Sequence, residues 1–83
     1  MAVKAFVLIE VTAGKSKQVV ADLTAIRQQV KEIQSVDMVT GPYDIITVME
    51  GPDINAIGNL VTKHIQSVIG VARTVTCLTI KLE

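Results

Sequence analysis

The sequence predicts an α+β fold, a four-stranded antiparallel sheet with two helices on one face, and three observations support this. The chain has 83 residues, which is the size of one domain. Segments with alternating apolar residues and segments with a helical apolar period follow one another as strand, helix, strand, strand, helix, strand. Glycine and proline stand at most of the boundaries between these segments.

The first half of the chain contains a strand, a helix and one arm of a hairpin. Residues 2–12 form the first predicted strand, because apolar residues occupy every second position from Val3 to Val11. Ser16 is expected to cap a helix that runs to about Ile33, and a second strand is expected over residues 34–40. The apolar stripe of this helix comprises Val19, Val20, Leu23, Ile26 and Val30.

The second half repeats this plan of strand, helix and strand, which suggests an internal pseudo-twofold. Gly41-Pro42 predicts a turn before a third strand over residues 43–50, so that strands two and three form a hairpin. Asp53 is expected to cap a second helix, Gly70 to end it, and residues 71–82 to form the last strand. The apolar positions of the second helix are Ile54, Ile57, Leu60, Val61, Ile65 and Val68. This element order is that of a ferredoxin-like βαββαβ sandwich, and residues 1–83 are expected to form a single domain.

The aliphatic content of the chain predicts a partner for the sheet. Hydrophobic residues make up 49% of the chain but aromatic residues only 2%. The first strand is apolar on both faces, since Phe6 and Leu8 interrupt its more polar side, and a strand of this kind is covered on both faces. Helices of the same chain cover only one face. We therefore expect two sheets to pack face to face in a closed homodimer, a dimeric α/β barrel.

Charge and composition exclude several classes of function. Eight basic and eight acidic residues balance, so the chain lacks the cationic face that direct DNA binding needs. No apolar run reaches membrane-spanning length, no secretion leader is expected, and one cysteine suits a cytoplasmic protein. With Cys77 and His64 as the only residues of their types, neither a metal site nor a cofactor is expected.

No set of residues with the spacing of a catalytic site is present. His64 is expected to be a partly buried packing residue on the second helix, because no carboxylate partner is placed beside it by spacing. Cys77 is expected to be a buried small hydrophobe within the last strand, and Asp37 to be solvated at a strand edge.

Two polar features remain as candidate binding groups. In the stretch 40–44, Tyr43 offers a ring and a hydroxyl, and Asp44 a carboxylate suited to an ammonium group. The alternative is a plain hairpin turn in which Asp44 bonds its own backbone. Thr74 and Thr76 place two hydroxyls on one face of the last strand and can donate to a carboxylate, although alternating threonines are also ordinary strand residues.

These two features together carry a resemblance. The run VTGPYDII at 39–46, followed by GVARTVT at 70–76, resembles the effector-binding domain of the leucine-responsive regulatory protein and asparagine-synthesis regulator (Lrp/AsnC) family, over essentially the whole chain. The resemblance implies sheet-to-sheet dimers that assemble into octamers or decamers and bind amino-acid effectors in clefts between dimers. It further implies that Asp44 faces the effector's amino group and that the threonines approach from another subunit. The implied effector-binding residues are Gly41, Pro42, Tyr43, Asp44, Thr74 and Thr76.

One departure from the family pattern shapes the expected function. Family members carry a helix-turn-helix domain before this one, whereas Met1 here directly precedes the first strand. The expected protein is thus a stand-alone effector-binding and oligomerisation module, not an enzyme, that modulates transcription through partner regulators. It would do so either by mixing with full-length Lrp/AsnC regulators or by sensing for another partner, and the sequence does not choose between the two. The alternatives are a small dimeric α/β-barrel enzyme of monooxygenase or isomerase type, a bare assembly module, or an amino-acid-binding regulatory domain of a metabolic enzyme. The last would use the turn at 12–15.

Overall fold

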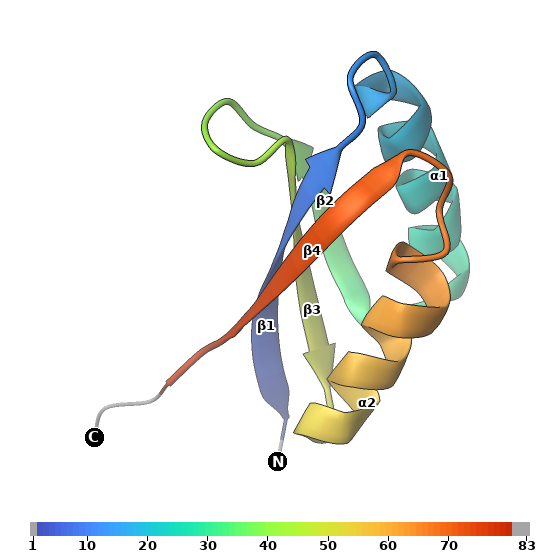
Figure 1. The fold of residues 1–83 in the computed structure, drawn as a ribbon. Helices are drawn as coiled ribbons and strands as arrows, with labels where there is room; N and C mark the ends of the chain where they lie inside the picture. The colour runs from blue at the N-terminus through green and yellow to red at the C-terminus, as the bar shows by residue number, and fades with distance from the viewer. Residues whose placement is uncertain (1, 81–83) are drawn as a thin grey trace.

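A computed structural model describes residues 2–80 and has the predicted α+β architecture (Figure 1). The sheet is antiparallel with the strand order β2-β3-β1-β4, and the helices lie together on one of its faces. The expected ferredoxin-like βαββαβ sandwich is confirmed. Its elements are β1 (Val3–Val11), α1 (Ser16–Gln29), β2 (Ile33–Met38), β3 (Ile45–Gly51), α2 (Ile54–Leu60), the π-helix η1 (Val61–Ile65) and β4 (Val71–Leu78).

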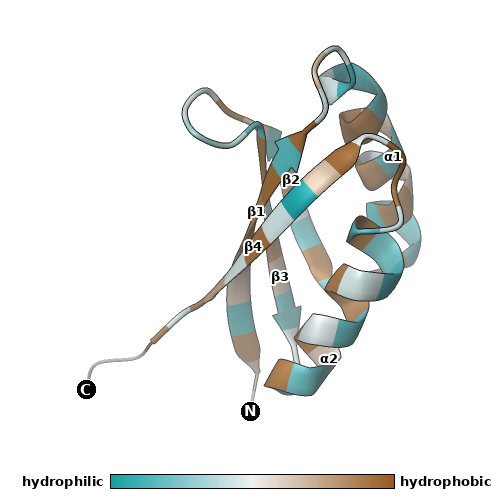
Figure 2. Cartoon of the chain, in the orientation of Figure 1, coloured by the Kyte–Doolittle hydropathy of each residue, from teal (hydrophilic) through white to brown (hydrophobic). Residues whose placement is uncertain are grey.

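The hydrophobic core lies between the sheet and the helices. Ala5, Val7 and Ile9 alternate along β1 and are fully buried, as the period-two pattern predicts. Hydrophilic residues gather on the outward surface of the helices (Figure 2). The stripe predicted for α1 is confirmed, with Val19 and Leu23 buried and the remaining members packed against the core. The core also includes Ile33, Ile45, Met49, Ile57, Val61, Ile65 and Val68.

Both predicted ends of α1 are wrong in detail. Ser16 is the first helical residue, and Lys15 occupies the cap position without a side-chain hydrogen bond, so Ser16 is not the cap. The helix ends at Gln29 because Val30 turns to an extended backbone at φ −114° and ψ 95°. Ile33, which was expected to end the helix, instead begins β2, where it is buried and pairs with Met49.

The second helix combines a confirmed cap with an unexpected π turn. Asp53 caps α2 as predicted, since its Oδ1 accepts a hydrogen bond of 2.8 Å from the Ala56 amide. Further along, the Gln66 amide donates to the Val61 carbonyl, five residues back, at 2.8 Å. An α-helix bonds four residues back, so this bond marks a π turn in the second helix. The prediction for Ile54 is wrong, because this side chain is 60% exposed at the rim of the molecule.

The strand limits differ from the predicted ones by a few residues. β2 covers 33–38 where 34–40 was expected, and β3 covers 45–51 where 43–50 was expected. β4 ends at Leu78, so the expected strand is too long, and its last positions, 81 and 82, lie outside the described residues. Within residues 2–80, no helix is long and apolar enough to cross a membrane.

The face of the sheet turned away from the helices is apolar and open. Residues that pair directly across antiparallel strands share a face, so the strand register defines this set. We call it the open face; its apolar members are Phe6, Leu8, Ile46, Val48, Val75 and Cys77. Phe6 is 37% exposed, with the Lys4 ammonium 5.3 Å from its ring centroid. Cys77 pairs with Phe6 on this uncovered face and is exposed. The prediction that Cys77 is buried is therefore wrong for the single chain.

Candidate functional site

The loop at 39–44 projects beyond the sheet between β2 and β3 (Figure 1). It is closed by a 2.9 Å hydrogen bond from the Val39 amide to the Asp44 carbonyl. Gly41 has a φ of +136°, which L-residues rarely adopt. A Cβ added at Gly41 would meet no atom within 4 Å, so the need for glycine there is one of backbone conformation and not of space. The loop thus presents Pro42 and Tyr43 outside the core.

Asp44 joins this loop to the end of β1. Its amide donates to the Ile9 carbonyl at 3.0 Å, and its Oδ2 accepts from the Val11 amide at 2.8 Å. Ile9 and Ile45 are the last pair between β1 and β3. Beyond them, the Asp44 carboxylate continues the contact between the strands by bonding the Val11 amide. The Asp44 side chain bonds the backbone of a residue 33 positions away, and only the Asp44 main chain takes part in closing its own turn. A carboxylate has acceptor capacity left after one such bond.

The two threonines lie on β4, across β1 from the loop. Thr74 pairs with Ile9 and Thr76 with Val7, so both side chains are on the helix side of the sheet, and they share a face as predicted. Thr74 is half-buried and Thr76 exposed.

A residue that the sequence did not single out completes the surroundings of Thr74. The side-chain amide of Gln66 donates to Thr74 Oγ1 at 2.9 Å. Both residues line a hollow of about 320 Å³, together with Val71, Ala72 and Arg73. Helical periodicity gave no signal for Gln66, because the π turn before it changes which side chains face β4.

The structure brings the loop and Thr74 to the same end of the sheet, on opposite sides of β1. Both groups lie next to Ile9 of β1. The Ile9 carbonyl accepts a hydrogen bond from the Asp44 amide on one side, and Ile9 pairs with Thr74 of β4 on the other side. Two strand spacings separate β3 from β4, about 10 Å. Thr76 lies two residues farther from this end. A single chain therefore carries two separate groups of candidate residues, with β1 between them.

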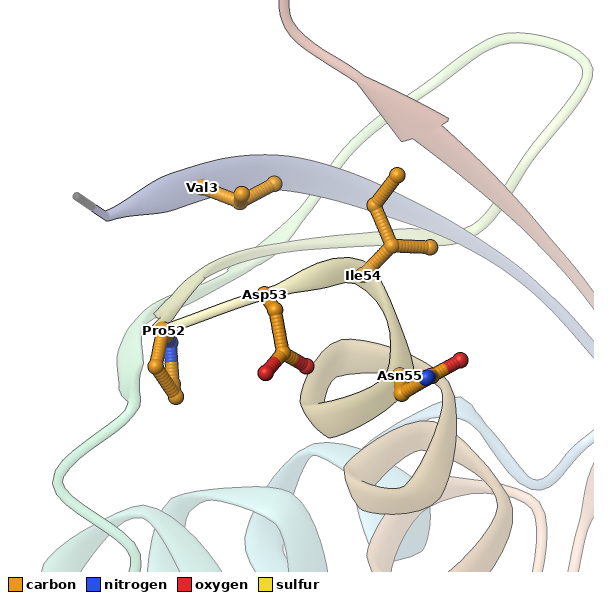
Figure 3. Close-up of a pocket in the computed structure, with 5 residues that line it drawn as sticks. All are labelled: Val3, Pro52, Asp53, Ile54 and Asn55. Carbon is orange, nitrogen blue, oxygen red and sulfur yellow. The ribbon is translucent and has the colours of Figure 1, made fainter.

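A larger hollow at the opposite end of β1 holds none of the predicted residues. It measures about 560 Å³ and is lined by Val3, Pro52, Asp53, Ile54 and Asn55 (Figure 3). Its one carboxylate, Asp53, already caps α2. Among residues 2–80, no group of three histidine, cysteine, aspartate or glutamate side chains is placed to hold a metal ion. His64 is half-buried on η1 and Asp37 is exposed on β2, as expected of a packing and a solvated residue.

Solved structures share this fold. TTHA0845 from Thermus thermophilus superposes with a TM-score of 0.83 at 28% identity, over 98% of this chain and 96% of its own. AsnC from Escherichia coli gives a TM-score of 0.82 at 21% identity, over 96% of this chain and 52% of its own. A transcriptional regulator from Neisseria meningitidis, NMB0573, solved as a complex with L-Met, gives 0.80 at 23% identity, over 95% of this chain and 50% of its own. The chain thus spans about half the length of the two regulators.

The sequence itself matches a family model. No curated protein matches the chain. Residues 4–82, however, match the model of the Lrp/AsnC ligand binding domain, which is nearly the whole sequence. Together with the fold, this match shows that the chain belongs to the family of Lrp/AsnC ligand binding domains.

Proposed function

We propose that this chain is an effector-binding module that recognises a free amino acid and regulates transcription through partner regulators, without catalysing a reaction. The observation that carries the proposal is the placement of the 41–44 loop and Thr74 at one end of the sheet in a chain of this ligand-binding family. The L-Met complex of the Neisseria meningitidis regulator supports an amino acid as the class of ligand.

The chemistry of the two groups supports the same class of ligand. Asp44 supplies a carboxylate for an ammonium group, and the hydroxyls of Thr74 and Thr76 supply donors for a carboxylate. Gly41 and Pro42 shape the loop that presents Tyr43 as an apolar and polar contact. The proposed effector-binding residues are therefore Gly41, Pro42, Tyr43, Asp44, Thr74 and Thr76.

Dimerisation through the open face is part of this proposal. Six apolar residues of the strands lie on that face, and both helices are on the other. Exposed apolar patches of this kind mark interaction surfaces, and a second copy supplies a matching patch about a twofold axis. Because β1 separates Asp44 from Thr74 within one chain, higher assembly into octamers or decamers would let the loop of one subunit approach the β4 of another.

A thermal-shift screen against the twenty amino acids at fixed protein concentration tests the proposal. An amino acid present at a hundred times its Kd stabilises the native state by about 2.7 kcal/mol. One or a few amino acids should raise the Tm, and Asp44→Asn should abolish the effect. Asp22→Asn is the matched control, since Asp22 lies on α1 and bonds only Gln18 among the side chains described. If none of the twenty raises the Tm, the proposal is wrong.

A further inference from the structure

The turn that leads into β4 presents an apolar side chain to solvent. Ile69 is 83% exposed, the highest value among the large apolar side chains of residues 2–80. The Val71 amide donates to the Val68 carbonyl at 3.1 Å, which closes the turn with Ile69 and Gly70 at its two central positions. A single exposed apolar side chain is common on protein surfaces, so Ile69 becomes informative only if the molecule also carries a surface that fits it.

Two contacts anchor this turn to the rest of the chain. The Thr12 amide donates to the Gly70 carbonyl at 2.8 Å, which ties the turn to the connection between β1 and α1. Gly70 has a φ of +105°, and a Cβ added there would lie 2.8 Å from Val19 Cγ2 and 3.1 Å from Lys15 Cβ. Ile69 is therefore held on a turn that is already ordered, which reduces the entropy that a contact through it would lose.

The hollow of about 560 Å³ at the other end of β1 has the complementary shape. We call it the Ile54 hollow. Val3, Pro52 and Ile54 give it three apolar walls, with Val3 coming from β1 and the other two from the connection between β3 and α2 (Figure 3). Ile54 is 60% exposed, so an apolar side chain that entered the hollow would remove apolar surface from water on both sides of the contact.

Ile69 and the Ile54 hollow of one chain lie too far apart to meet. Val3, which lines the hollow, is the first residue of β1, and Thr12, which bonds the turn of Ile69, follows its last residue. The nine residues of β1 between them span about 30 Å. The Ile69 side chain can therefore enter this hollow only in another copy of the chain.

The charges beside the two features favour a second copy as the partner. Lys15 is exposed and lies against the turn of Ile69. Asp53 lines the Ile54 hollow, and although its Oδ1 accepts from the Ala56 amide, a carboxylate has acceptor capacity left after one such bond. A contact between two copies would bring this ammonium group to the side of the carboxylate, and opposite charges across an interface help to fix its register.

We propose that Ile69 of each chain enters the Ile54 hollow of a chain in a neighbouring dimer, and that this contact is reciprocal. A reciprocal contact has a twofold axis of its own, distinct from the axis of the packing through the open face. Two kinds of twofold interface alternate around a closed ring of dimers. The inference deepens the assembly part of the proposed function, on which it rests, by naming the residues that join one dimer to the next.

Charged substitutions test the contact by sedimentation velocity of the full chain over a range of concentrations. The wild type should assemble beyond the dimer. Ile69→Asp and Ile54→Lys should each weaken the association of dimers at least about tenfold, because a buried apolar contact is lost and a charge takes its place. Lys15→Glu should weaken it about threefold, as expected of an exposed ion pair. Thr24→Asp is the matched control, since it adds a charge to the exposed surface of α1 outside both features, and it should change nothing.

Two recovery experiments decide whether Ile69 meets the hollow or another surface. The double variant Ile69→Asp/Ile54→Lys should associate more tightly than either single variant, because the introduced carboxylate meets the introduced ammonium group of the other chain. An equimolar mixture of the two single variants should also associate, since one supplies an intact Ile69 and the other an intact hollow. Circular dichroism checks the fold, and Ile54→Ser replaces Ile54→Lys if that variant does not fold. Recovery in neither experiment would overturn the inference.

This inference and the proposed effector function fail in different ways. If the wild type sediments only as dimers while an amino acid raises its Tm, the effector function stands and the contact through Ile69 is refuted. If assembly depends on Ile69 and Ile54 as described but none of the twenty amino acids raises the Tm, the contact stands and the amino-acid function falls.

Discussion

Asp44 combines a structural bond with a proposed binding role, and two substitutions separate them. Asp44→Ala removes the 2.8 Å bond from the Val11 amide to Oδ2, which is partly buried. A hydrogen bond to a charged group contributes about 1.5–3 kcal/mol, and the lower value suits a partly exposed pair. The free energy of unfolding should fall by about 1.5 kcal/mol. For a domain of this size that lowers the Tm by about 6–12 °C.

Asp44→Asn keeps an oxygen that accepts from Val11 but loses the charge. It should cost only about 0.5 kcal/mol, the difference between a charged and a neutral acceptor. Both variants should lose the stabilisation by an amino acid, because neither has a carboxylate for the ammonium group. The assay is thermal unfolding with and without the effector at one protein concentration. A Tm of Asp44→Ala equal to that of the wild type would refute the structural role, and effector binding retained by Asp44→Asn would refute the binding role.

Four further substitutions test the core, two turns and the open face. Thr47→Val should raise the Tm by about 4–8 °C, because the fully buried Thr47 Oγ1 has no hydrogen-bond partner among residues 2–80; a lower Tm would contradict this. Gly70→Ala should lower the free energy of unfolding in urea by about 2 kcal/mol, and Gly41→Ala by about 1 kcal/mol. Both glycines have a positive φ, but only at Gly70 would the new Cβ lie 2.8 Å from Val19 Cγ2, so equal losses would count against this contact. Ile46→Glu places a charge on the open face and should convert dimers to monomers in sedimentation experiments, with the circular dichroism of the fold retained.

The sequence predicted what depends on local pattern and capping. The alternation of Ala5, Val7 and Ile9, the α1 stripe and the Asp53 cap are all confirmed, because each depends on residues close in the chain. The end of α1 was wrong, because burial of Ile33 against Met49 in the sheet competes with one more helical turn.

The groups around the site depend on contacts that no local pattern reveals. The Asp44 bond to Val11 spans 33 positions, and the side-chain amide of Gln66 meets Thr74 directly after a π turn that the sequence did not indicate. Cys77 was expected to be buried because strand cysteines usually are, but its exposure depends on whether a second sheet covers the open face. The roles predicted for the loop and the threonines stay predictions.

The π turn at Val61–Ile65 also determines which changes in the length of the second helix the fold tolerates. Deleting one residue between Val61 and Ile65 would turn the bond from the Gln66 amide to the Val61 carbonyl into an ordinary α-helical one, and Gln66 and Val68 would keep facing the same sides. Deleting one residue from the α-helical part of α2 would instead turn everything after it by about 100°, which would move Gln66 away from Thr74 and Val68 out of the core. An insertion in the projecting loop at 39–44 would disturb neither. Relatives should therefore differ in the length of that loop far more readily than in the length of the second helix.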